Sequence, residues 1–143
     1  MKILDLGCGD GWFTKLLVSK GFDCVGIDTH VREEERFYQG SANKIPFPND
    51  HFDCIIMFEV IEHIDPSCYN EINRVLKNHG KIILSTILPK SDPIVHLLSK
   101  LKIADPYITP HINLVKIKNL PWKMITEDRI LVMDQFGVFE KEP

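Results

Sequence analysis

The stretch Leu4–Gly11 (LDLGCGDG) carries glycine at alternate positions, namely Gly7, Gly9 and Gly11. Because glycine has no Cβ, the backbone of such a loop can approach a ligand closely, which suits the binding of a cofactor. A dinucleotide fingerprint has the spacing G-x-G-x-x-G, and counting from Gly7 its third glycine should fall at position 12, which is Trp12. The spacing therefore predicts a cofactor loop and argues against a nicotinamide dinucleotide.

A second group of reactive side chains follows the apolar run Phe52–Phe58. Glu59 and His63 are four residues apart in this stretch. If the stretch is helical, the two side chains share a face, and the carboxylate can orient the imidazole as a general base for an accepting atom. The alternative is that Glu62 and His63 hold the loop through hydrogen bonds to the backbone.

Both groups must be positioned by regular elements around them. An apolar run ends at the glycine loop and a segment with helical periodicity follows, so the loop joins a strand to a helix. Runs that are apolar throughout are typical of strands buried on both faces of a parallel sheet. The predicted strands are Lys2–Leu6, Cys24–Ile27, Phe37–Gly40, Phe52–Phe58 and Lys81–Ile87. The predicted helices are Trp12–Lys20 and one that begins after Asp65-Pro66-Ser67 and ends near Gly80.

The remaining connections differ in length and character. The polar segment Thr29–Arg36 allows at most about two helical turns of ~3.6 residues each. Further on, Ile94–Leu101 is apolar enough for a helix, and Pro106 and Pro110 enclose a loop before Ile112–Leu120. Strand segments around a turn at Gly137 are expected at Trp122–Thr126, Ile130–Met133 and Val138–Glu140. Strands that alternate with helices predict an α/β layered fold with a mostly parallel sheet.

Five segments, taken in order, resemble one known family. They are LDLGCGDG, VGID ending at Asp28, NKIPFPNDHFD, MFEVIEHI and INRVLKNHGKIILST. Together they resemble the motifs of the class I S-adenosylmethionine-dependent methyltransferases, type 11, over residues 2–88. The resemblance implies a Rossmann-like methyltransferase fold with a mostly parallel central sheet, an antiparallel C-terminal strand and helices on both faces. Residues 1–143 would form a single S-adenosylmethionine-binding domain that lacks the usual N-terminal cap helices.

The resemblance also implies the residues of the cofactor site. The cofactor-binding set carried over is Asp5, Gly7, Cys8, Gly9, Asp28, Ser41, Ala42 and Phe58. Within it, Asp28 would accept hydrogen bonds from both ribose hydroxyls, as a carboxylate does in the analogous dinucleotide site, and its alternative role is a helix cap. Family members commonly have an acidic residue at the position of Ser41, so adenine recognition here would rest on the Ala42 backbone and on stacking.

A metal-assisted reaction is the alternative for the residues after the fourth strand. Glu59-x-x-Glu62-His63 resembles the divalent-metal ligands of small-RNA 2′-O-methyltransferases and of some quinone O-methyltransferases, and His111 could complete such a set. The same EVIEHI pattern occurs in methyltransferases without a metal. We therefore expect no metal and assign catalytic roles to His63 and Glu59 alone.

Bulk composition limits the remaining function classes. The net charge of −3 offers no general attraction to nucleic acid, and no apolar run approaches the ~20 residues that span a bilayer. The four cysteines have no C-x-x-C spacing, which suits a reducing compartment without a zinc site. No signal peptide precedes the first strand. We expect a cytoplasmic protein with no membrane anchor and no nucleic-acid partner.

The expected absence of cap helices leaves the cofactor cleft open. We expect a partner chain, a homodimer contact or the Pro89–Pro110 segment to cover it. Core packing is the alternative for the apolar residues of that segment, which are Ile94, Leu97, Leu98 and Leu101.

Three functions follow from these patterns. The first is methyl transfer from S-adenosylmethionine, with S-adenosylhomocysteine as product, to an unidentified acceptor that we expect to be a small molecule. The second is a cofactor-binding but catalytically reduced scaffold or subunit of a larger complex. The third, a nicotinamide-dependent oxidoreductase, is disfavoured by Trp12 and by the later motifs.

Overall fold

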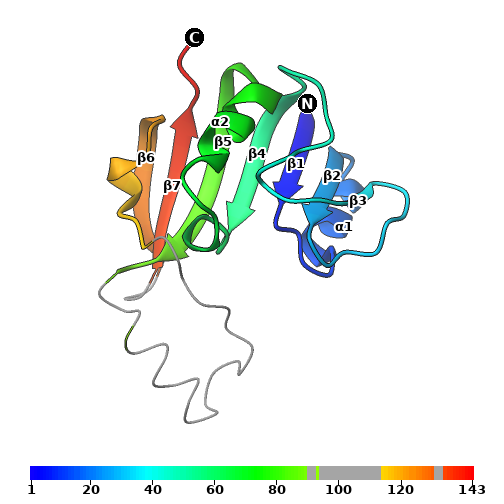
Figure 1. The fold of residues 1–143 in the computed structure, drawn as a ribbon, viewed down its shortest axis with the longest axis horizontal. Coiled ribbons are helices and arrows are strands. Elements are labelled where there is room, and N and C mark those ends of the chain that lie inside the picture. Colours follow the sequence, from blue (N-terminus) through cyan, green and yellow to red (C-terminus); the bar gives the residue numbers. More distant parts are fainter. Residues whose placement is uncertain (90–92, 94–113, 131–133) are drawn as a thin grey trace.

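The computed structural model describes residues 1–89, 93, 114–130 and 134–143. Within them, seven strands form one sheet in the order β3-β2-β1-β4-β5-β7-β6 (Figure 1). The strands are β1 (Lys2–Leu6), β2 (Asp23–Asp28), β3 (Phe37–Gln39), β4 (Phe52–Phe58), β5 (Leu76–Ile87), β6 (Lys123–Ile130) and β7 (Asp134–Glu140). The helices are α1 (Trp12–Ser19) and α2 (Cys68–Val75), with short 3₁₀ turns η1 (Ile61–His63) and η2 (Ile117–Asn119).

Six strands of the sheet run in one direction, and β7 runs antiparallel to both of its neighbours, β5 and β6. The central strands β1 and β4 are mostly buried because helices cover the sheet, and this is why, after the exposed Lys2, they read as apolar runs that are interrupted only by Asp5 and Asp53. Leu4 and Ile55 pair across these two strands, and both are fully buried. The mostly parallel sheet with one antiparallel C-terminal strand confirms the predicted fold class.

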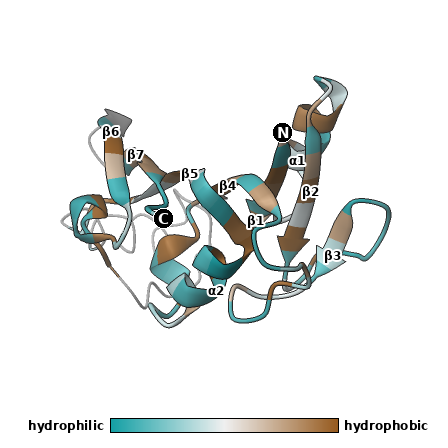
Figure 2. Ribbon diagram, turned by 90° about the horizontal axis from the view of Figure 1, so that it is seen from above, coloured by the Kyte–Doolittle hydropathy of each residue, from teal (hydrophilic) through white to brown (hydrophobic). Residues whose placement is uncertain are grey.

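Helices lie on both faces of the sheet, as predicted (Figure 2). Helix α1 covers one face by packing Phe13, Leu17 and Val18 against a buried cluster of sheet residues. The larger core on the other face includes Ile72 and Val75 of α2. Among the described residues, no helix is both long enough and apolar enough to cross a membrane.

Helix α2 is shorter than predicted, since it ends at Val75 and not near Gly80. Its last carbonyl groups are used by the chain that leads into β4: the Asp50 N–H donates to Arg74 O (2.9 Å) and the His51 N–H to Val75 O (2.8 Å). Leu76 then pairs with the first residue of β4, so β5 begins where the apolar stripe was expected to continue as helix. Tertiary pairing therefore overrides the local helical pattern.

The predicted turn at Gly137 is wrong. Gly137 lies in the middle of β7, where it pairs with Leu84 of β5 and Glu127 of β6. A Cβ at this position would lie 2.6 Å from the ring of Phe139, so close packing explains the glycine. Within residues 114–130 and 134–143, the C-terminal region forms the strands β6 and β7, and all but the first residue of the predicted segment Ile130–Met133 lies outside the described residues. The predicted helix Ile94–Leu101, with the loop between Pro106 and Pro110, lies outside the described residues.

The connections between β2 and β4 contain no helix among residues 29–51, all of which the structure describes. The loop after β3 is instead held from α2. Arg74 donates to the carbonyl oxygens of Ile45 (3.0 Å) and Phe47 (2.8 Å), and Glu71 accepts the Ile45 N–H (2.8 Å). Glu71 and Arg74 also bond to each other at 2.8 Å. This pair therefore replaces a helix as the support of the Ser41–Asn49 loop.

The Glu71–Arg74 pair predicts a measurable acid sensitivity. The hydrogen bond from Arg74 lowers the pKa of Glu71 from 4.5 to about 2. A lowered carboxyl pKa stabilises the fold above the unfolded-state pKa and loses this effect as pH falls towards the folded-state value. Between about pH 6 and pH 2 we expect the free energy of unfolding to fall in both proteins. The fall should be smaller in Glu71→Gln than in the wild type, by about 2 kcal/mol. Urea unfolding across this range measures the difference.

The exposed Glu33 offers a matched control, and Glu33→Gln should follow the wild-type pH dependence. An equal fall for Glu71→Gln and the wild type would show that Glu71 does not stabilise the fold in this way.

Candidate functional site

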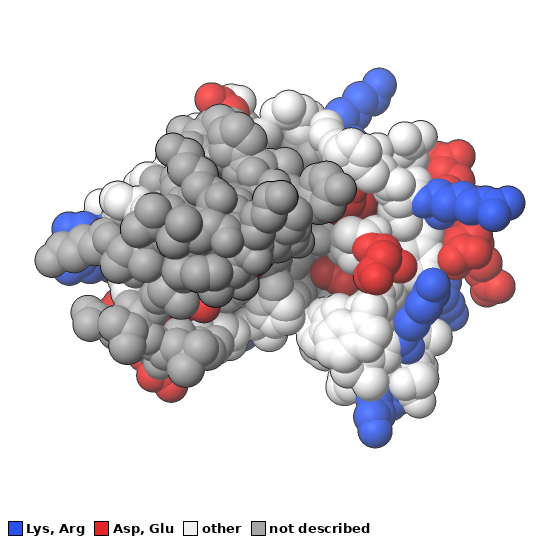
Figure 3. Space-filling view, turned by 90° about the horizontal axis from the view of Figure 1, so that it is seen from below, with Lys and Arg blue, Asp and Glu red and all other residues white. Residues whose placement is uncertain are grey.

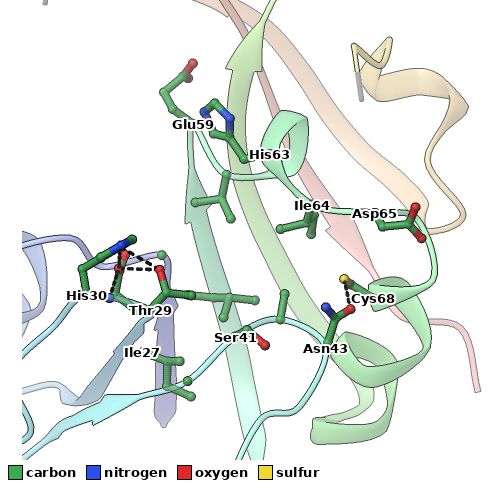
Figure 4. Close-up of a pocket in the computed structure, with 16 residues that line it drawn as sticks. Ile27, Thr29, His30, Ser41, Asn43, Glu59, His63, Ile64, Asp65 and Cys68 are labelled. Carbon is green, nitrogen blue, oxygen red and sulfur yellow. Dashed lines mark hydrogen bonds and ion pairs between the residues drawn. The ribbon is translucent and has the colours of Figure 1, made fainter. Parts of the chain in front are cut away.

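A cavity of about 580 Å³ opens at the carboxyl ends of the parallel strands. Its lining comes from the glycine loop, from the end of β2, from the loop after β3 and from the turn after β4 (Figure 4). It brings together six residues predicted for the site, which are Gly7, Asp28, Ser41, Ala42, Glu59 and His63. This is the edge at which open α/β sheets bind ligands.

The glycine loop turns back against β2. The N–H groups of Gly7 and Cys8 donate to the carbonyl oxygen of Ile27 at 2.8 and 3.1 Å. Gly7 has a φ of +80°, and a Cβ there would lie 2.4 Å from Val60 Cγ2. Position 7 therefore requires glycine on grounds of both conformation and space.

Asp28 closes the loop from the end of β2. Its Oδ2 accepts the Gly9 N–H at 3.0 Å, and its Oδ1 accepts the His30 N–H at 2.9 Å. Its side chain is 18% exposed and lines the cavity. No helix follows Asp28 within residues 29–36, so the helix-cap alternative is wrong. The carboxylate instead orders the backbone around it and remains accessible at the cavity wall.

Asp5 lies beneath the loop and is 4% exposed. It accepts a hydrogen bond from Thr14 Oγ1 at 2.6 Å, and the backbone of Thr14 also bonds to it. Burial raises the pKa of Asp5, and the charge of Asp28 raises it further. Asp5 thereby links the end of β1 to the first turn of α1.

The loop after β3 supplies one wall of the cavity. Ser41 is half-buried and forms a bridge with Lys44, while Ala42 is buried in the core. Next to them, the Cys68 thiol donates to Asn43 Oδ1 at 2.7 Å (Figure 4). Both predicted adenine-site residues therefore line the same cavity as Asp28.

Glu59 and His63 both reach the cavity, although the stretch that carries them is not an α-helix. Glu59 has a φ of +54°, and only Ile61–His63 forms a 3₁₀ turn. Both side chains nevertheless line the cavity, and Figure 4 shows them on the turn that follows β4. Glu59 Oε1 accepts a hydrogen bond from Ser85 Oγ. Burial raises the pKa of Asp134, and the charge of Glu59 adds to this rise.

The candidate metal ligands are not gathered in the described part of the chain. Glu62 is fully buried and does not line the cavity with Glu59 and His63, and neither of its carboxylate oxygens has a hydrogen-bond partner among the described residues. No group of three or more His, Cys, Asp or Glu side chains able to hold a metal occurs among residues 1–89, 93, 114–130 and 134–143. His111 lies outside these residues.

Sequence reasoning missed the residues that shape the loop from below. A Cβ on Gly26 would lie 2.8 Å from both Cys8 Sγ and Thr14 Oγ1, so β2 needs glycine there to admit the loop. The glycine within an apolar strand was an available sign of close backbone approach. Val60 and Ser85 had no comparable sign, because their contacts join segments distant in sequence.

A second, smaller cavity of about 370 Å³ adjoins the first. The described residues that line it are Asp5, Gly7, Cys8, Asp10, Trp12, Phe13 and Phe58. Since Gly7 lines both cavities, the glycine loop separates them. Four residues predicted for the cofactor site, Asp5, Gly7, Cys8 and Phe58, therefore meet here.

Comparisons with known proteins agree with this arrangement. Residues 1–125 match a family model described as a methyltransferase domain. An uncharacterized methyltransferase, YcgJ of Bacillus subtilis, is 28% identical over 110 residues, which are 66% of this chain and 44% of that protein. The ubiquinone biosynthesis O-methyltransferase of Azorhizobium caulinodans is 28% identical over 102 residues, 61% of this chain and 40% of that protein. The chain thus spans less than half the length of these relatives.

Among solved structures, an S-adenosylmethionine-dependent methyltransferase from Mesorhizobium loti superimposes with a TM-score of 0.71 at 15% identity. The superposition covers 98% of this chain and 90% of that one. At this level of identity, the similarity concerns the fold.

The buried Asp5–Thr14 contact predicts an effect on stability. Thr14→Val keeps the shape of this fully buried residue but removes the hydroxyl donor, which leaves a buried carboxyl oxygen short of a partner. We expect the free energy of unfolding to fall by about 1–3 kcal/mol. Thr14→Ser should cost less, because it keeps the donor and removes one methyl group, worth about 0.8 kcal/mol. Urea unfolding compares the two, and a valine variant as stable as the serine variant would contradict the assignment.

Proposed function

The chain belongs to the class I S-adenosylmethionine-dependent methyltransferase family, and we propose that it transfers the methyl group of S-adenosylmethionine to a small acceptor molecule. One observation carries this proposal. A single cavity is bounded by the glycine loop and Asp28 on one side and by Glu59 and His63 on the other. A group that holds a cofactor and a group that can move a proton thus face the same space.

The described residues fit S-adenosylmethionine in shape and chemistry. In our proposal, Asp28 accepts the ribose hydroxyls, because its carboxylate is held by two backbone N–H groups at the cavity wall. Ser41 and Ala42 line the adenine end. Gly7, Cys8 and Gly9 border the amino-acid end, where the absence of a Cβ permits close approach. Asp5 supports the loop from its buried position.

The bound sulfonium supplies a reactive methyl group, so the chain has mainly to align the acceptor with it. Where the accepting atom must lose a proton, we propose His63 as the general base. Glu59 is held by Ser85 Oγ and lines the same cavity as His63. A left-handed backbone at a non-glycine residue such as Glu59 is costly and is often found at functional sites.

The size of the two cavities, about 580 and 370 Å³, supports a small acceptor. A relative that acts in ubiquinone biosynthesis, named above, is in keeping with this class. The carboxylates at this edge, grouped near the centre of the face in Figure 3, disfavour a nucleic-acid backbone. We further propose a cytoplasmic setting, because the four cysteines are free.

We also propose that a second chain covers the cavities during the reaction. Two apolar side chains that line the smaller cavity are exposed to solvent, Trp12 at 67% and Phe58 at 39%. Light scattering over a range of concentrations, with and without S-adenosylmethionine, tests a homodimer. A monomer under every condition, together with full activity, would contradict a required partner.

The cofactor assignment predicts selective binding. We expect calorimetry to detect S-adenosylmethionine and S-adenosylhomocysteine but not NAD. Asp28→Asn should lower the affinity for both of these ligands by about ten- to a hundredfold, because it removes the charged acceptor of the ribose hydroxyls. Asp23→Asn is the control, since Asp23 is exposed at the other end of the same strand. Binding of NAD alone would overturn the proposal.

Catalysis requires its own test because the acceptor is unidentified. The protein incubated with methyl-labelled S-adenosylmethionine and a small-molecule extract should label at least one compound. His63→Gln should slow labelling by about a hundredfold or more if the acceptor must lose a proton, with cofactor affinity unchanged. Tight cofactor binding with no labelled compound, in extracts of several sources, would favour the catalytically reduced scaffold instead.

A further inference from the structure

Three aromatic side chains form one wall of the smaller cavity. Trp12 and Phe13 begin α1, and Phe58 ends β4. The rings of Phe13 and Phe58 lie 5.1 Å apart between centroids, and those of Trp12 and Phe13 lie 6.0 Å apart. Phe13 also packs into the core, whereas Trp12 is 67% and Phe58 39% exposed at the cavity. Two large rings are therefore exposed to solvent at the cavity, and large apolar side chains in such positions are candidates for ligand contact.

The charges around this wall are all of one sign. The described lining residues include the carboxylates of Asp5 and Asp10 and no lysine, arginine or histidine. Asp10 is exposed at the rim, where its Oδ1 accepts the Trp12 N–H at 3.1 Å and orders the start of α1. The faces of aromatic rings have a negative electrostatic potential, so both the rings and the carboxylates attract a cation. The cavity is suited to an organic cation.

The position of the wall relative to Asp28 identifies that cation. Gly7 lines both cavities, so a ligand anchored at Asp28 that continues past Gly7 reaches the aromatic wall. In S-adenosylmethionine, the positively charged sulfonium joins the ribose side of the molecule to its amino-acid end.

We propose that Trp12 and Phe58, backed by Phe13, bind the sulfonium of S-adenosylmethionine through their ring faces and so distinguish it from neutral S-adenosylhomocysteine. This inference rests on the proposed function. Loss of the methyl group removes the positive charge, so the same wall favours the substrate over the product of the reaction. Weaker product binding at the wall then assists product release.

Three ligands separate charge from shape. S-adenosylmethionine carries the sulfonium, S-adenosylhomocysteine a neutral thioether, and sinefungin a protonated amine in the same place. We expect Trp12→Leu and Phe58→Leu each to lower the affinity for S-adenosylmethionine and for sinefungin by about two- to tenfold. The affinity for S-adenosylhomocysteine should change by less than about twofold. Trp12→Phe should keep most of the wild-type preference. Calorimetry measures all three affinities.

Matched controls guard against indirect effects. Phe22→Leu removes an aromatic ring of similar exposure (42%) just beyond the other end of α1 and should leave the three affinities unchanged. Trp122 is 6% exposed and donates from Nε1 to Asn73 Oδ1 at 2.6 Å, so its fluorescence reports folding in the Trp12 variants. In the wild type, S-adenosylmethionine should also shield Trp12 from acrylamide quenching.

The outcomes are distinguishable. If Trp12→Leu and Phe58→Leu weaken all three ligands equally, the wall supplies only apolar contact, and the inference is overturned while the proposed function stands. If these variants change no affinity, the wall does not touch the cofactor, and the inference fails in the same way. If the wild-type protein binds none of the three, the proposed function fails and the inference with it.

Discussion

The close packing of the glycine loop against β2 is the contact on which the rest of the structure depends. The carbonyl oxygen of Ile27 accepts the N–H groups of Gly7 and Cys8, and Gly26 leaves room for the side chains above it. This contact brings the ends of β1 and β2 to one place, so that Asp28 reaches the Gly9 N–H. It also sets the start of α1 over Asp5. A larger side chain at Gly7 or Gly26 would push the glycine loop away from β2.

Strand direction explains why acidic groups collect at one edge. Parallel strands end at the same edge of the sheet, which brings Asp28 and Glu59 to a common cavity. Because β7 runs the other way, its first residue, Asp134, lies where β5 ends, within the electrostatic reach of Glu59. Ser85 of β5 then holds Glu59 in place. The electrostatics of this edge therefore follow from the topology, since each carboxylate comes from a different strand.

Local patterns predicted the elements whose surroundings agree with their own preference. The strands Lys2–Leu6 and Phe52–Phe58 have the predicted bounds, because most of their residues are buried and apolar, with Asp5 and Asp53 as the interruptions. Prediction failed where a distant segment competes. Leu76 leaves the helical pattern to pair with Phe52, and Gly137 accommodates the ring of Phe139 within a strand. Neither contact leaves a trace in the neighbouring residues of the sequence.

The sequence by itself determined the kind of site. Glycine at alternate positions, with Asp28 at the end of the next strand, specifies a close-approach loop with a carboxylate beside it, because these properties belong to short, contiguous segments. Only the tertiary structure decided which reactive groups share that site. Glu59 and Glu62 are three residues apart, yet the turn after β4 sends Glu59 to the cavity and buries Glu62 outside its lining. The direction of a side chain in a non-helical turn depends on the strands packed around it, and so it has no period in the sequence.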